Sequence, residues 1–480
     1  MKKLNSKVAG AITNLSYTFV ANIICTLISM AIVAVVPKAL GTVEYGYWQL
    51  YGFYGSYNGF FHLGWADGIY LRYGGKEYKE LDKKLFHSQF WLLFAFEMLV
   101  AVGVAIFAVF FVEDSSKKVI FYMLALCCIL QLPRGMLQYV LQGTNRIKEY
   151  AKNVLAEKLI YGVSVVVMVS LGVRDFRFLL LADLAAKLIT LLTICWSCRD
   201  IVISKAMNFA ASVQEAWENI TVGVKLMFAN VASMLIIGIV RFAIERVWSV
   251  EVFGQVSLTL SISNMLMLFI SAVSVVMFPL LKRTPQEKWA DNYIFLRTTL
   301  VVPMLAILMA YYPAKVILSA WLPQYAESLS YMALMFPMCM YEGKMSMIIS
   351  TYLKALRREN LMLSVNLISV CLSLLTTGII VYSLKNLPLA VVSILGLLAF
   401  RSILAEVFLA RILEIKVGTD ILLEVAMTII FIWSSWIVRG WAGVGIYLGA
   451  YVVYLLLKRK DIAGTFRIVK ETFRPSATAE

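Results

Sequence analysis

Charged residues interrupt several long apolar stretches of this sequence, and their chemistry is that of anion binding or ion exchange. A charged side chain at the centre of a bilayer costs about 2.5–3.5 kcal/mol on insertion scales, so each one needs a partner or water. Arginine suits phosphate because its planar fork can hold two oxygens. The candidate substrate-binding cations are Arg134, Arg401, Lys187, Arg241, Arg246 and Lys344, and the candidate ion-coupling carboxylates are Asp183, Glu342 and Glu406.

Two of these cations have a carboxylate four residues away, which places both groups on one helix face. The pairs are Asp183 with Lys187 and Arg241 with Glu245. For these residues self-neutralisation and a binding role both stay open. Arg134 and Arg401 have no carboxylate at that spacing, because Glu406 is five residues from Arg401. We therefore expect Arg134 and Arg401 to be unneutralised and to face a polar cavity; a structural pair of Arg401 with Glu406 is the alternative.

The stretch 44–66 is unusually rich in tyrosine. Aromatic rings stack on sugar rings, and phenol groups can hydrogen-bond to them, so Tyr47, Tyr51 and Tyr54 are candidate sugar contacts. An interfacial aromatic belt with ordinary packing is the alternative.

Composition shows where these residues must lie. Apolar residues make up 61% of the 480 residues and charged residues 15%, whereas soluble domains average about 45–50% and about 25%. A spanning helix needs about 20 mostly apolar residues, and the sequence predicts an all-α membrane protein with fourteen of them. The expected spans are 13–36, 44–66, 88–112, 119–142, 154–173, 178–198, 225–247, 254–278, 293–312, 328–351, 361–383, 388–410, 420–438 and 441–457. Arg439 and Gly440 make a tight hairpin between the last two.

Basic residues set the orientation. With the N-terminus inside, 27 Lys and Arg fall in inner segments and 8 in outer ones, as the positive-inside rule requires. We therefore expect a multi-pass protein of the cytoplasmic (inner) membrane with both termini cytoplasmic. The net charge of +15 reflects this topology and does not indicate nucleic-acid binding. An amphipathic stretch around Phe209 to Trp217 is expected along the inner membrane surface.

The sequence lacks the motifs of several common chemistries. The sequence contains no G-x-x-x-x-G-K-[ST] phosphate loop. Its only histidines are His62 and His87, so a histidine metal site is not credible. Cys195 and Cys198 form a C-x-x-C without the βαβ context of a redox motif. We expect no cofactor, no metal and a transporter rather than an enzyme; a polytopic polysaccharide polymerase or ligase, the alternative of another class, usually has a long outer loop.

An internal repeat indicates two related halves. At an offset of 208 residues, Ala21-Asn22 matches Ala229-Asn230, and Gly46 matches Gly254. Both copies run in the same direction, which predicts a parallel repeat about an axis along the membrane normal. The expected division is an N-terminal six-helix lobe at 1–198, a cytoplasmic linker at 199–223, a C-terminal six-helix lobe at 224–411, and helices 13 and 14 with a cytoplasmic tail at 412–480.

Four segments carry a family resemblance: PKALGTVEYGYWQL at 37–50, Gly64 to Arg72, VFGQVSL at 252–258 with FPLLKR at 278–283, and WLPQYAESL at 321–329. They resemble Wzx-type polysaccharide flippases of the multidrug/oligosaccharidyl-lipid/polysaccharide exporter superfamily. The resemblance implies two pseudo-symmetric lobes around a central cavity. It also implies transport of a polyprenyl-pyrophosphate-linked oligosaccharide for O-antigen, lipopolysaccharide or capsule synthesis.

The expected partners follow from this resemblance: the lipid-linked oligosaccharide, membrane lipid and other polysaccharide assembly proteins, with no nucleic acid. A multidrug or small-cation exporter of the same fold is the first alternative, although it would favour an anionic cavity. A lipid II flippase is the second.

Overall fold

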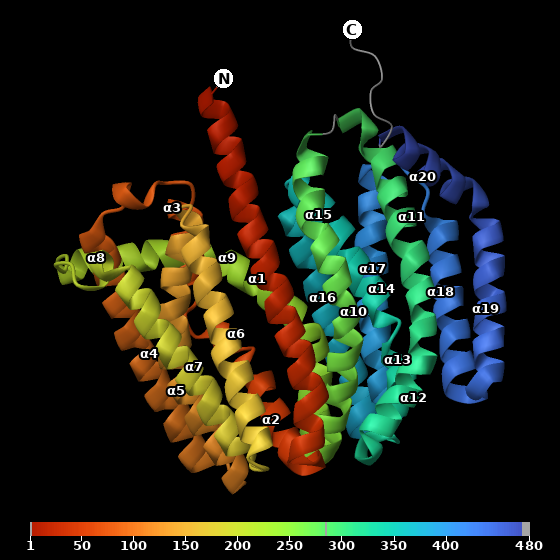
Figure 1. The fold of residues 1–480 in the computed structure, drawn as a ribbon, viewed down its shortest axis with the longest axis horizontal. Coiled ribbons are helices and arrows are strands. Elements are labelled where there is room, and N and C mark those ends of the chain that lie inside the picture. The colour runs from red at the N-terminus through yellow and green to blue at the C-terminus, as the bar shows by residue number, and fades with distance from the viewer. Residues whose placement is uncertain (1, 284–285, 473–480) are drawn as a thin grey trace. The chain divides into compact units, whose positions relative to one another are not determined.

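The computed structural model describes residues 2–283 and 286–472, and within these ranges all regular structure is helical (Figure 1). Eleven of the helices are long and apolar enough to cross a membrane. The prediction of an all-α, multi-pass membrane protein is therefore confirmed.

The chain forms two compact units. Unit 1 comprises residues 1–231 and 250–254, and unit 2 comprises residues 232–249 and 255–480. The first helices in the chain are α1 (Lys2–Leu40), α2 (Thr42–Gly55), α3 (Trp65–Tyr73), α4 (Lys83–Phe111), α5 (Ser115–Gly143), α6 (Ile147–Ser170), α7 (Phe176–Ser197), α8 (Arg199–Val202) and α9 (Phe209–Val247). They are followed by α10 (Val250–Arg283), α11 (Trp289–Ile307), α12 (Tyr311–Trp321), α13 (Met332–Met335), α14 (Met338–Gly343), α15 (Ser350–Ala355), α16 (Glu359–Thr377), α17 (Leu387–Ile412), α18 (Gly418–Ile432), α19 (Gly440–Leu457) and α20 (Arg459–Thr472).

Short polar caps start the spanning helices of unit 1. Asp82 accepts hydrogen bonds from the first amides of α4, and Asp114 does the same for α5. Asp175 accepts one from the amide of Arg177 at the start of α7. Each carboxylate satisfies amides that have no partner inside the helix. These caps fix where α4, α5 and α7 begin. Helix α5 packs against both α4 and α7, and α6 packs against α7 and α1.

The second expected span, 44–66, is not one helix. It breaks after α2 into turns and a 3-10 segment at Asn58–Phe60, and the chain then enters α3. Leu63 and Gly64 both have positive φ angles, 52° and 81°, and the left-handed conformation cannot continue an α-helix. The prediction of one continuous span was therefore wrong.

The tenth expected span, 328–351, is also interrupted. Short segments α13, α14 and α15 follow a 3-10 turn, and Lys344–Ile349 is a π-helix. Pro337 separates α13 from α14. The residues from Met332 to Tyr341 are buried, so this stretch faces protein. The eighth expected span lies inside α10, in which most side chains from residue 266 onward, including those of FPLLKR at 278–283, are outside the described part of the chain.

The last two expected spans meet in the hairpin that the sequence predicts. A π-helical turn at Trp433–Val438 ends α18, and α19 begins at Gly440. Arg439 and Gly440 have φ angles of 60° and 61°. The tail continues as α20, and Arg474 lies outside the described residues.

The expected linker at 199–223 is largely helical, because α9 begins at Phe209 and runs on into the seventh span. Arg72 of α3 forms ion pairs with Glu215 and Glu218 of α9, at 2.5 and 2.8 Å. A Cβ on Gly68 would lie 1.8 Å from the carbonyl oxygen of Asn219, so the two helices touch backbone to backbone. Phe209, Val213 and Trp217 are exposed on the other side, and their position on the inner membrane surface stays a prediction.

Within unit 1 the two glycines matched by the repeat face each other. A Cβ on Gly254 would lie 2.6 Å from the Cα of Gly46, and one on Gly46 would lie 2.3 Å from the carbonyl oxygen of Val250. Only glycine permits so close an approach. Superposition of the two halves stays a prediction.

Candidate functional site

A polar pocket of about 220 Å³ lies inside unit 1, where α2, α5, α6 and α7 come together. Its walls combine one ammonium, one carboxylate, two amides and three aromatic rings. The polar and aromatic lining residues are Trp48, Gln49, Tyr51, Gln131, Tyr161, Asp183 and Lys187. Three of the residues that the sequence singled out, Tyr51, Asp183 and Lys187, are thus brought to one place.

Asp183 and Lys187 form an ion pair on one face of α7. Their four-residue spacing predicts this contact, and the ion pair is confirmed; a binding role for Lys187 stays a prediction. The hydroxyl of Tyr51, from α2, donates to Oδ2 of Asp183 at 2.7 Å. The side chains of Lys187 and Asp183 are 10% and 15% exposed. Among the described residues the ammonium therefore has one carboxylate partner, and it lies at the wall of the pocket.

Aromatic and amide groups complete the pocket. The indole nitrogen of Trp48 donates to the hydroxyl of Tyr161 at 2.9 Å, which fixes both rings. Gln49 bonds to Tyr45 on its own helix, and no atom would lie within 4 Å of a Cβ on Gly52. The glycine leaves open space beside the rings, as a ligand that stacks on them requires.

The other two candidate sugar contacts lie elsewhere. The hydroxyl of Tyr47 donates to Asp114 at 3.0 Å, and its ring stacks on Phe176. The ring of Tyr54 packs at 5.3 Å from that of Phe121. Neither lines the pocket, and a sugar contact at these two tyrosines stays a prediction.

Arg134 is neutralised, contrary to the prediction. Its Nη2 lies 2.6 Å from a carboxylate oxygen of Glu157 on α6, and its Nη1 donates to the hydroxyl of Thr190 on α7 at 2.7 Å. Its side chain is 7% exposed. The arginine thus joins α5, α6 and α7, and the partner is a residue 23 positions away that helix spacing within α5 does not reveal.

Arg401 is also paired, and not with Glu406. Its Nη1 lies 3.2 Å from Glu342 of α14, whose side chain is 26% exposed. Glu406 faces another way and binds Arg297 and Lys344. Both the unneutralised form of Arg401 and the alternative pair with Glu406 were therefore wrong. The candidate carboxylate Glu342 and the candidate cation Lys344 are two residues apart in sequence, but they form ion pairs with different residues.

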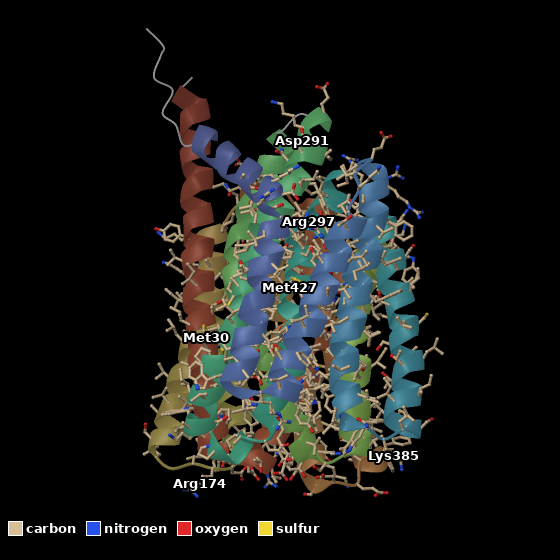
Figure 2. All side chains as sticks on the ribbon, turned by 90° about the vertical axis from the view of Figure 1, so that its right-hand side faces the viewer. Met30, Arg174, Asp291, Arg297, Lys385 and Met427 are labelled. Carbon is tan, nitrogen blue, oxygen red and sulfur yellow. The ribbon has the colours of Figure 1, made fainter. Side chains whose placement is uncertain are left out.

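Unit 2 contains a fully buried network of four charges. Lys344 Nζ lies 2.5 Å from Glu406 of α17 and 2.6 Å from Glu424 of α18. Arg297 of α11 contacts the same two carboxylates at 2.7 and 2.5 Å. The side chains are at most 4% exposed. Two cations and two carboxylates neutralise each other here, and Figure 2 shows Arg297 toward the end of unit 2 opposite Lys385.

The network continues toward the predicted inner surface. Arg297 also lies 3.3 Å from Asp420, and Asp420 pairs with Lys458, which follows α19. Burial lowers the pKa of Lys458, but hydrogen bonds from its ammonium to Asp420 and Asp461 raise it more, so the pKa is above its ordinary value. The chain of ion pairs joins α11, α17 and α18 to the start of α20.

The remaining candidate cations lie on α9. Nη2 of Arg241 donates to the hydroxyl of Ser257 at 2.9 Å. Arg246 forms an ion pair with its neighbour Glu245 at 3.4 Å, and its side chain is 52% exposed. Arg246 is therefore exposed, and its role as a substrate-binding cation stays a prediction.

The sequence analysis did not single out several charged residues, among them Glu97, Glu157, Arg297 and Glu424. These four lie within expected spans, and that position alone was a usable signal. Glu97 differs from the others because it is 0% exposed and neither carboxylate oxygen has a hydrogen-bond partner in the described structure. In the same described part of the chain, no group of three His, Cys, Asp or Glu side chains is arranged to hold a metal ion.

Comparison with known proteins gives a likeness of fold. No protein-family model matches the sequence, and no curated protein matches it. The structure resembles an inward-facing multidrug resistance MATE family transporter of the MOP superfamily, with a TM-score of 0.59 and 12% identity over 83% of this chain and 96% of that one. It also resembles the lipid II flippase MurJ in an inward closed conformation, with a TM-score of 0.56 and 12% identity over 94% of this chain and 100% of that one. The chain has the fold of these transporters.

Proposed function

We propose that this protein is a flippase that carries a polyprenyl-pyrophosphate-linked oligosaccharide across the cytoplasmic membrane for surface polysaccharide synthesis. The observation that carries the proposal is the pocket of unit 1, where the ammonium of Lys187 lies beside aromatic rings within a membrane-spanning bundle. A pyrophosphate needs a cation in a wet site, and a sugar needs rings and hydroxyls. The fold, shared with a protein named a lipid II flippase, supports a substrate of this kind.

The ion pair suggests how binding is coupled to an ion. The ammonium of Lys187 is paired with Oδ2 of Asp183, and the hydroxyl of Tyr51 donates to the same oxygen. A phosphate oxygen competes with Asp183 for the ammonium, so protonation of Asp183 frees Lys187 for the substrate. In this scheme Lys187 holds the pyrophosphate, Asp183 is the coupling carboxylate, and Tyr51 holds the carboxylate in place.

Deletion and complementation test this function. Deleting the gene should abolish the surface polysaccharide and trap its lipid-linked intermediate in the inner leaflet. Lys187→Gln should fail to complement at a normal protein level, because the amide keeps the shape but cannot neutralise a phosphate. Arg177→Gln, on the exposed start of the same helix, is the matched control and should complement. Full complementation by Lys187→Gln, or unaltered polysaccharide after deletion, would refute the proposal.

The carboxylate of the same pocket favours one second candidate, an exporter of organic cations. Asp183 beside Trp48 and Tyr51 presents a negative charge and aromatic faces, which attract a cation. The fold is shared with a MATE family transporter. In this case deletion should leave the polysaccharide unchanged and raise sensitivity to cationic dyes, and Asp183→Asn should be the damaging variant while Lys187→Gln is tolerated.

A further inference from the structure

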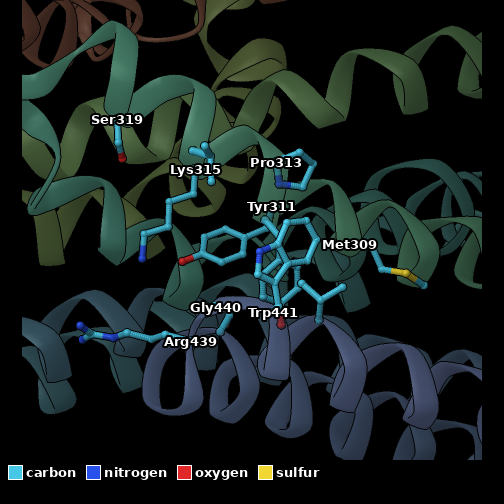
Figure 3. A pocket seen from close by; sticks show the side chains of 12 residues that line it. Met309, Tyr311, Pro313, Lys315, Ser319, Arg439, Gly440 and Trp441 are labelled. Carbon is cyan, nitrogen blue, oxygen red and sulfur yellow. The ribbon is translucent and has the colours of Figure 1, made fainter.

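A second pocket, of about 820 Å³, lies within unit 2 between α12 and the hairpin that joins α18 to α19 (Figure 3). Most of its wall is apolar or aromatic. Its lining includes Tyr311, Val316 and Trp441, and two cations, Lys315 and Arg439, also line it. In Figure 3 the ends of the two cationic side chains lie on the same side of the pocket.

The two cations have no counter-ion among the residues that the structure describes. Neither Lys315 nor Arg439 takes part in an ion pair with any residue that the structure describes. Nε of Arg439 donates to the carbonyl oxygen of Trp436 at 2.8 Å, and Nζ of Lys315 lies 5.9 Å from the centre of the Tyr311 ring. Arg439 is close enough to Lys315 for the two charges to repel each other. An anion between them would remove that repulsion.

The position of the pocket matches the headgroup level of a membrane. Both cations fall in segments that the charge pattern places outside. Trp441 is 89% exposed at the start of α19, as indoles are at a membrane interface. Val316 and Ile317, also largely exposed, extend the apolar surface along α12. The pocket thus offers positive charge at one level and hydrocarbon-like surface beside it.

From these observations we propose that the pocket binds an anionic phospholipid of the outer leaflet. The phosphate lies between Lys315 and Arg439, and an acyl chain covers the apolar wall beside Tyr311 and Val316. A free phosphate would make no contact with that apolar wall, so the lipid is the better match. The proposal does not rest on the transport function, because it concerns a different pocket in the other unit.

Brominated lipids test the proposal, because bromine on an acyl chain quenches tryptophan fluorescence at short range. The full-length protein is placed in nanodiscs with brominated phosphatidylglycerol or brominated phosphatidylcholine. The contribution of Trp441 is the difference between the wild type and Trp441→Phe. It should be quenched at a roughly 25-fold lower fraction of phosphatidylglycerol than of phosphatidylcholine, since each of the two basic residues near the headgroup is worth roughly fivefold in binding.

Charge variants supply the second arm. Lys315→Gln and Arg439→Gln should each reduce the preference for phosphatidylglycerol by about fivefold, and the double variant should abolish it. Lys385→Gln, which removes another cation of an expected outer loop, is the matched control and should keep the preference. Equal quenching by both lipids, or a double variant that retains the preference, would overturn the proposal. Relief of quenching by excess inorganic phosphate would also overturn it, because the site would then be one for free phosphate.

Discussion

Replacing Lys344 by methionine should strongly destabilise unit 2. The lysine is 0% exposed and contacts both Glu406 and Glu424. Arg297 then remains as the only cation of the buried network against two carboxylates, so one negative charge has no partner. Breaking a buried ion pair in this way costs about 3–5 kcal/mol, because the stranded charge is still out of water.

The assay is the free energy of unfolding of the purified protein in micelles, measured by denaturant titration or steric trapping. Lys344→Met combined with Glu424→Gln leaves Arg297 opposite Glu406, which are 2.7 Å apart, and restores neutrality. The double variant should therefore recover at least half of the loss. Lys385→Met, at an exposed loop position, should change the free energy by less than about 0.5 kcal/mol. A loss below about 1 kcal/mol in Lys344→Met, or additive losses in the double variant, would refute the network.

Three further variants and one fusion test other parts of the structure. Arg134→Gln should lower the free energy of unfolding by about 3 kcal/mol by stranding Glu157, and Glu157→Gln in the same chain should restore most of it; no rescue would count against the pair. Glu97→Leu should raise the free energy of unfolding by about 1–3 kcal/mol, because it removes a buried carboxyl without hydrogen bonds; a loss would point to a missing partner. Gly46→Leu should abolish folded protein in fluorescence-detected size exclusion, since its Cβ would lie 2.3 Å from a carbonyl oxygen; a normal yield would disprove the close approach. A reporter fused after Lys385 should read as outside, and an inside signal would reverse the predicted topology.

Hydrophobicity and local rules predicted much of the fold. Apolar length located the spans that became α4 to α7, and the hairpin at Arg439 and Gly440 needed only a two-residue break between apolar runs. Both features depend on residues near in sequence. Apolar length did not predict where the backbone leaves the helical conformation. The turn at Leu63 and Gly64 interrupts a stretch that is apolar enough to be predicted as one helix.

The partners of buried charges could not be predicted in the same way. Spacing gave the pair of Asp183 with Lys187, because both lie on α7. It could not give Glu157 for Arg134 or Glu342 for Arg401, since these contacts cross from one helix to another. An unpaired intramembrane charge is costly, which implies that a partner exists. Every charged residue within the expected spans is therefore a candidate partner, and none should be predicted to be unpaired before all of them are considered.

Burial separates the charges that can exchange partners from those that cannot. In unit 2, Lys344 is shared by two carboxylates and has no exposed surface, so a new anion would have to displace both from a buried site. In unit 1, Lys187 has one carboxylate partner and lines a pocket of about 220 Å³. If another anion takes the place of Asp183 beside Lys187, the ammonium stays paired during the exchange, and the displaced carboxylate can take up a proton. Both clusters are electrically neutral, but they differ in access: the buried one holds helices together, and the one at the pocket has the exposure that the proposed binding of a substrate needs.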